Sequence, residues 1–119
     1  MKVLFRGVGA YDRPIAQGAD ALREGHEYVV LEVFAAADGR NMFRVEVSSD
    51  ELPPLFDSRL FEVTDGSIPA CWCLFVGMRG DIVMGPEEWE TNPDFWDSYI
   101  DGEPWAVALY QSGKEKSLG

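Results

Sequence analysis

Apolar and polar residues alternate in a strand-like pattern over part of the first half of the chain. In residues 42–47 (MFRVEV) every second side chain is apolar and those between are charged, as in a strand with one solvent-facing side. Residues 26–34 (HEYVVLEVF) are rich in β-branched and aromatic side chains. The Asp38-Gly39 pair between the two runs is a strong turn signal. The pattern therefore predicts a β-hairpin here.

Shorter apolar runs predict the remaining strands. They lie at residues 2–8, 60–64, 71–77 and 81–85, and the last two form a second hairpin. Residues 48–59 contain Pro53-Pro54, which cannot donate to a strand ladder, and are predicted as a loop. One helical turn is expected at residues 19–23. The run at 71–77 is apolar on both faces, so a later segment is expected to cover its outer side.

Three prolines in the last third stand where helices are expected to begin. Proline is tolerated at the first helical position because its missing N–H would be unpaired there. Pro86, Pro93 and Pro104 therefore predict short helices over residues 86–90, 93–100 and 104–111. Residues 104–111 also alternate, so a strand remains open there. The polar residues 113–119 are expected to form a flexible tail.

These elements predict one α+β domain over residues 1–112. Its first part, 2–85, is expected to be a small antiparallel β-barrel or a strongly bent sheet of the SH3-like kind. The acidic, aromatic residues 86–111 follow as short C-terminal helices packed on its apolar face. A chain of 119 residues is long enough to bury a single core.

The charge of the chain is negative and unevenly distributed. There are 10 Lys and Arg against 21 Asp and Glu, a net charge of −11, and residues 80–113 hold eight acids and no base. Phosphate binding depends on Lys and Arg, so direct nucleic-acid binding is disfavoured, as is an anionic membrane surface. A basic protein partner is expected instead. No apolar run approaches the roughly 18 residues that span a bilayer, and a cytoplasmic location is expected.

No sequence motif indicates a catalytic, metal or cofactor site. A Gly-x-Ser-x-Gly nucleophile elbow and an Asp-x-Asp-x-Asp-Gly calcium loop are both absent. Cys71 and Cys73 are expected to be reduced thiols, and with only His26 beside them they cannot complete a four-ligand zinc site. We therefore expect no enzymatic activity, although a small enzyme using carboxylates such as Glu87, Glu88 and Glu90 stays open as an alternative.

The predicted helix over residues 93–100 has an aromatic face and an acidic face. The aromatic face is expected to cover the strand at 71–77. On the other face, Asp97 and Asp101 are like charges four residues apart, which costs about 0.2–0.5 kcal/mol and favours a role in binding. In this hypothesis the carboxylates of the segment supply a negative electrostatic field that attracts a basic partner, and its tryptophans supply the apolar contacts that anchor the partner. The predicted partner-binding residues are Glu90, Asp94, Trp96, Asp97, Asp101 and Trp105.

Two resemblances add to this interpretation. Residues 22–47 (LREGHEYVVLEVFAAADGRNMFRVEV) and 55–63 (LFDSRLFEV) resemble small bacterial and phage-encoded SH3-like barrel proteins. The acidic segment with Pro86, Trp89, Phe95-Trp96 and Asp101-Gly102 is similar to bacterial immunity-type proteins. The second likeness implies an inhibitor that neutralises a basic partner such as a toxin nuclease. The alternative is an SH3-like peptide-binding adaptor that uses Tyr28, Phe43 and Phe56. The oligomeric state is left open.

Overall fold

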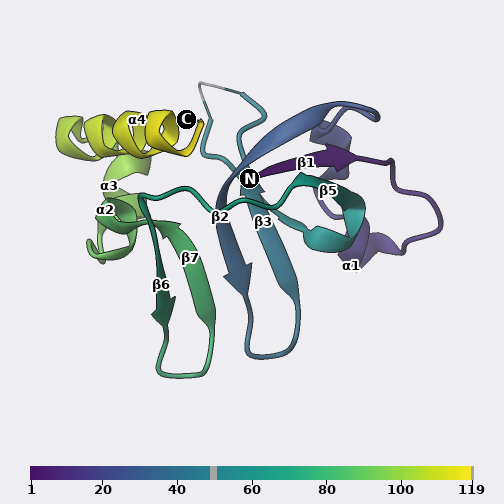
Figure 1. The fold of residues 1–119 in the computed structure, drawn as a ribbon, viewed down its shortest axis with the longest axis horizontal. Coiled ribbons are helices and arrows are strands. Elements are labelled where there is room, and N and C mark those ends of the chain that lie inside the picture. Colours follow the sequence, from purple (N-terminus) through teal and green to yellow (C-terminus); the bar gives the residue numbers. More distant parts are fainter. Residues whose placement is uncertain (49–50, 119) are drawn as a thin grey trace.

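The computed structural model describes residues 1–48 and 51–118 and has an α+β architecture. Seven antiparallel strands form one sheet that does not close into a barrel, and three helices follow it in the chain. Figure 1 shows these helices, α2 to α4, gathered at one end of the molecule, while the short helix α1 (Arg13–Ala16) lies at the other. The predicted α+β fold class is confirmed, and the sheet is open and not closed into a barrel.

The central strand of the sheet is β2 (Glu27–Ala35). One of its edges pairs with β3 (Asn41–Val45), which confirms the predicted hairpin. Its other edge is shared by two strands, β1 (Lys2–Phe5) along its first part and β7 (Ile82–Pro86) along its last part. The outer strands are β4 (Leu55–Asp57) beside β3, β5 (Phe61–Asp65) beside β1, and β6 (Trp72–Val76) beside β7.

A β-bulge interrupts the pairing of β2 with β3 at Leu31. Val30 lies opposite Val45 and Glu32 lies opposite Arg44, so Leu31 is an extra residue in the ladder. An extra residue reverses which face each following side chain occupies. Val33 therefore packs against the same core as Val30, and Glu32 is placed on the other face of the sheet.

The first core lies within the curved sheet. It is built from strand residues and aromatic rings, and the 3-10 turns η1 (Ala19–Ala21) and η2 (Ser58–Leu60) each add a buried residue. The ring of Phe61 packs against those of Phe5, Phe43 and Phe56, with centroids 6.0 to 6.3 Å apart. This core holds the strands in place, and the C-terminal helices pack on the opposite face of the sheet.

The second core joins that opposite face to the helices α2 (Glu87–Glu90), α3 (Phe95–Ile100) and α4 (Pro104–Leu118). The indole of Trp89 is stacked between the rings of Phe95 and Tyr110, at centroid distances of 5.5 and 5.4 Å. Leu31, the extra residue of the bulge, lies on this face and completes the cluster. The aromatic residues of the C-terminal segment therefore fix the helices to β2.

This arrangement corrects the expectation that the aromatic face of α3 covers the strand at 71–77. In β6, Trp72 is buried, but Leu74 and Val76 are 56% and 66% exposed. The strand next to β2 is β7, so helices that pack over β2 leave the far end of β6 uncovered. Figure 1 shows the β6–β7 hairpin projecting beside the β2–β3 hairpin, away from the helices.

Three element boundaries also differ from those expected. The predicted loop at 48–59 contains β4, because only Pro53-Pro54 lack a donor and pairing resumes after them; its residues 49–50 lie outside the described part. The expected turn at 19–23 is the shorter η1. Residues 104–111 are helical, and α4 continues through the expected tail to Leu118 because its last turns are packed. Ser117 there is buried and accepts a hydrogen bond from the Trp72 indole N–H at 2.9 Å.

Candidate functional site

The outward side of α3 carries exposed carboxylates. Asp94, Asp97 and Asp101, named here the α3 acidic surface, are all exposed, and within residues 1–48 and 51–118 none of them forms a salt bridge. On α2, Glu88 differs, since Lys116 of α4 lies 3.7 Å from it. The structure thus brings one base of the C-terminal helix, Lys116, back toward α2, and among the described residues no base is bonded to the α3 acidic surface.

The two tryptophans predicted as anchors have different surroundings. Trp105, in the first turn of α4, is 43% exposed. Trp96 is partly buried, and the guanidinium of Arg44 lies over its ring, 4.3 Å from the centroid. This cation–π contact occupies a face of the Trp96 ring. Trp105 is therefore the tryptophan free to contact a partner, and Trp96 connects α3 to β3.

Glu90 points inward, unlike the other acids of its segment. Its Oε1 is buried, and no N–H or hydroxyl group in the described part of the chain donates to it. Its side chain lies within hydrogen-bonding reach of the carboxyl group of Glu32, which is 4% exposed, and a bond between the two needs a proton on one of them. We call Glu32 and Glu90 the carboxyl pair. Arg44 Nε donates to Glu32 Oε1 at 3.0 Å, and Arg44 Nη1 donates to the carbonyl of Pro53 at 2.6 Å.

The surroundings of the carboxyl pair favour a neutral Glu90. Burial, followed by the hydrogen bond and the charge of Glu32, raises the pKa of Glu90 from 4.5 to about 9, and the Arg44 charge acts in the opposite direction. Glu90 therefore does not add a full negative charge to the surface at pH 7. Gly85 leaves the space for this contact, since a Cβ there would lie 3.1 Å from Glu90 Oε1 and 3.2 Å from Glu32 Cγ.

A second polar cluster lies beside the first, between the end of β3 and α4. The hydroxyl group of the fully buried Tyr110 donates to Glu46, and Lys114 Nζ donates to the other oxygen of the same carboxylate at 2.7 Å. Burial, and then the hydrogen bond to Glu46, raise the pKa of Tyr110 above its usual range. These bonds fix α4 to the sheet and leave the carboxylate of Glu46 with two donors.

Sequence reasoning did not identify Glu32, Arg44 or Glu46 as members of a site. The alternation in 42–47 places the charged residues on one face of a strand, and a wet face was the expectation. The available signal was Glu32, a single charge within the apolar run VVLEVF, together with Gly85 inside a strand. The contacts themselves depend on the bulge and on the position of α2.

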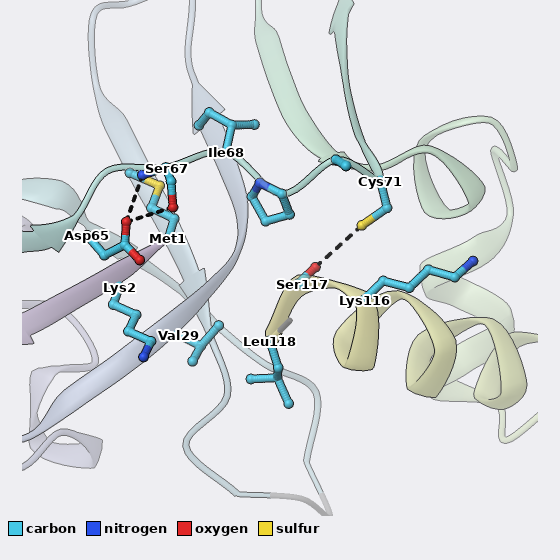
Figure 2. Close-up of a pocket in the computed structure, with 12 residues that line it drawn as sticks. Met1, Lys2, Val29, Asp65, Ser67, Ile68, Cys71, Lys116, Ser117 and Leu118 are labelled. Carbon is cyan, nitrogen blue, oxygen red and sulfur yellow. Dashed lines mark hydrogen bonds between the residues drawn. The ribbon is translucent and has the colours of Figure 1, made fainter.

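A groove with a volume of about 640 Å³ lies elsewhere, where the C-terminal end of α4 faces the start of β1 and the segment after β5. Figure 2 shows Cys71 Sγ directed at Ser117 Oγ, 3.9 Å away, and the Lys116 side chain extending away from the groove. Asp65 accepts hydrogen bonds from Ser67, which lower its pKa. This lining mixes apolar and charged groups and assembles no nucleophile with a base.

The aromatic residues on which the peptide-binding alternative depends lie inside the first core. Tyr28, Phe43 and Phe56, the aromatics of the peptide-binding alternative, are buried in the first core, so they offer no exposed aromatic surface. His26 packs edge-on against Tyr28 at 4.6 Å.

Within the described residues, no group of three or more His, Cys, Asp or Glu side chains is placed to hold a metal ion. No helix in the described part of the chain has the length and apolar character to cross a membrane.

The comparisons with known proteins leave the assignment of function to the geometry. No protein-family profile matches the chain, and no curated protein or solved structure is significantly similar to it.

Proposed function

We propose that this chain is a non-enzymatic acidic binding protein that engages a basic protein partner through the α3 acidic surface and Trp105. The observation that carries the proposal is the presence, on α3 and at its two ends, of three exposed carboxylates that form no salt bridge among the described residues and lie close in sequence to an exposed tryptophan. Negative surface potential steers a cationic partner, and a tryptophan that becomes buried supplies binding energy.

The inner side of α3 supports this role by holding the carboxylates in fixed positions. Phe95 is fully buried, and its ring stacks on Trp89 with planes 9° apart. Trp96 is held from the sheet side by Arg44. A binding surface that is ordered before contact loses less conformational entropy when the partner binds. The aromatic residues and the acids of this segment thus act together.

The kind of partner follows from charge. A nuclease active site attracts phosphate with Lys and Arg, and a rigid cluster of carboxylates is complementary to such a site. An immunity-type inhibitor of a toxin nuclease in the bacterial cytoplasm is therefore the form of the proposal that the charge favours. The carboxyl pair gives little support to an enzyme, because Glu90 Oε1 is shielded from solvent and a general acid must reach its substrate.

The test is capture of the partner from the source organism, followed by measurement of the affinity of the purified pair. In one variant Asp94, Asp97 and Asp101 are changed to Lys. In a matched control three exposed acids of the N-terminal half, Asp20, Glu24 and Glu51, are changed to Lys, which alters the net charge equally.

We expect the α3 variant to weaken binding at least about tenfold at 0.15 M salt and to lose most of its salt dependence, as steering predicts. The control variant should bind nearly as the unmodified protein does. Trp105→Ala should weaken binding with little change in salt dependence. Equal affinities and equal salt dependence for the α3 variant and the control would exclude the α3 acidic surface as the binding site.

A further inference from the structure

We infer that Glu90 and Glu32 share one proton, and that this proton fastens α2 to the sheet, so that loss of the proton at rising pH loosens the helices that follow. The inference concerns the folded chain alone and does not depend on the proposed partner. It rests on which groups surround the carboxyl pair and on which of them can donate a hydrogen.

The first reason is the lack of donors around Glu90. An ionised carboxylate only accepts hydrogen bonds, so two carboxylates cannot bond to each other without a proton. Glu90 Oε1 is buried, and no donor of the described residues other than a protonated carboxyl group is available to it. The contact with Glu32 therefore requires that one of the two carry a proton. Arg44 is bonded to Glu32, so the proton resides on Glu90.

The second reason is the balance of charge around the pair. Two charged groups act directly on Glu90, the carboxylate of Glu32 and the guanidinium of Arg44. In the described part of the chain Arg44 is the single cation bonded to the pair, and Lys114 is already bonded to Glu46. The other charged or titratable groups on the elements around the pair include Glu46 after β3, Cys73 on β6, Glu87 and Glu88 on α2, and Tyr110 and Lys114 on α4, and of these Glu88 is turned to solvent.

The third reason is that the pair cannot separate without moving a backbone element. Glu32 is fixed by the bulge opposite Arg44, and α2 is a single turn. Gly85 lies against both carboxyl groups, so the space between β7 and α2 is filled by them. If Glu90 ionises, two like charges meet in a poorly hydrated place, and the cheapest relief is for α2 to move outward.

The sign of the pH effect follows from proton linkage. Folding raises the pKa of Glu90 from 4.5 to about 9, so between these values the folded protein holds a proton that the unfolded chain has released. The stabilisation is complete below pH 4.5 and is lost as the pH rises toward 9. In this window the unfolding equilibrium constant should increase by up to about tenfold per pH unit from this group.

The direct test is infrared spectroscopy of the unmodified protein, which detects the carbonyl stretch of a protonated carboxylic acid. We expect this band at pH 7 and its disappearance at alkaline pH, and we expect it to be missing at pH 7 in Glu90→Gln. In Glu32→Gln the band should titrate at a lower pH, because the neighbouring negative charge is gone. Absence of a carboxylic acid band at pH 7 in the unmodified protein would overturn the inference.

The second test is urea unfolding between pH 5.5 and 7.5, below the usual pKa of thiols (about 8.5) and phenols (about 10). Glu90→Gln keeps the shape of the neutral acid and cannot ionise. The unfolding equilibrium constant of the unmodified protein should therefore increase with pH more steeply than that of Glu90→Gln, and the difference should reach up to about tenfold per pH unit. Glu88→Gln, on the exposed side of the same turn, is the matched control and should keep the original pH dependence. Equal pH dependence for Glu90→Gln and the unmodified protein would also contradict the inference.

Discussion

Replacement of Gly113 by Ala tests whether the aromatic stack under α4 is as rigid as its contacts indicate. In the interior of a helix, alanine is favoured over glycine by about 1 kcal/mol, so helix propensity alone predicts a more stable protein. Gly113 faces the Trp89 indole, however, and a Cβ at this position would lie 2.5 Å from Nε1 and 2.7 Å from Cε2. Real Cβ atoms do not approach other atoms so closely, so one partner must move.

The indole has little freedom to move. Trp89 is 2% exposed, its Nε1 donates to the carbonyl of Leu109 at 2.9 Å, and Phe95 and Tyr110 cover its two faces. Overpacking a filled core costs about 1–3 kcal/mol, and loss of the indole hydrogen bond would add about 1 kcal/mol. After the gain in propensity is subtracted, we expect Gly113→Ala to lower the free energy of unfolding by roughly 2 kcal/mol.

Urea unfolding at pH 7 measures this change, and a double-mutant cycle with Trp89→Phe identifies its cause. Phenylalanine has a smaller ring than the indole and lacks its outer atoms, including Cζ2, which a Cβ at position 113 would approach to 2.9 Å. The double variant should therefore be less destabilised than the sum of the single variants by at least about 1 kcal/mol. Additive effects, or a net stabilisation by Gly113→Ala alone, would refute the account of a rigid stack.

Two further substitutions test polar contacts on the same face. Ser117→Ala leaves the buried Trp72 indole N–H without its acceptor and should lower the free energy of unfolding, measured with urea, by about 1–3 kcal/mol. The control Ser112→Ala, on the same helix, should change this free energy by less than about 0.5 kcal/mol. Arg44→Met removes the cation bonded to Glu32 and should cost about 3–5 kcal/mol by thermal or urea unfolding at pH 7; a cost below about 1 kcal/mol would show that the charges are not coupled.

The hairpins were predictable because their signals are local. The turn at Asp38-Gly39 needs a positive φ, and Gly39 adopts φ 96°, while the flanking alternation sets both strands. The pairing of β2 with both β1 and β7 was not predictable in the same way, because these strands are far apart in sequence and nothing local selects their order. The same reason explains why an open sheet could not be distinguished from a closed barrel.

The α3 helix shows how far a periodic pattern reaches. Its aromatic residues are buried or partly buried and its aspartates are exposed, as the pattern indicated. The pattern does not say which strand the buried face meets, and the expected strand was the wrong one. Glu88 and Glu90 look equivalent in the sequence, yet one is exposed and one faces Glu32. That difference is set by Gly85 and by the bulge at Leu31, which bring the two carboxyl groups together.

Arg44 connects the carboxyl pair to the α3 acidic surface. Its guanidinium bonds Glu32 and also covers the ring of Trp96, which directly precedes Asp97. Trp96 also packs edge-on against Trp89 and Phe95 of the second core, at centroid distances of 5.4 and 4.8 Å. One cation of β3 therefore contacts both the carboxyl pair and the helix that carries the α3 acidic surface. The aromatic rings of the segment hold its buried charges and its exposed acids in one packed unit, which gives the dense mixture of aromatic and acidic residues a physical basis.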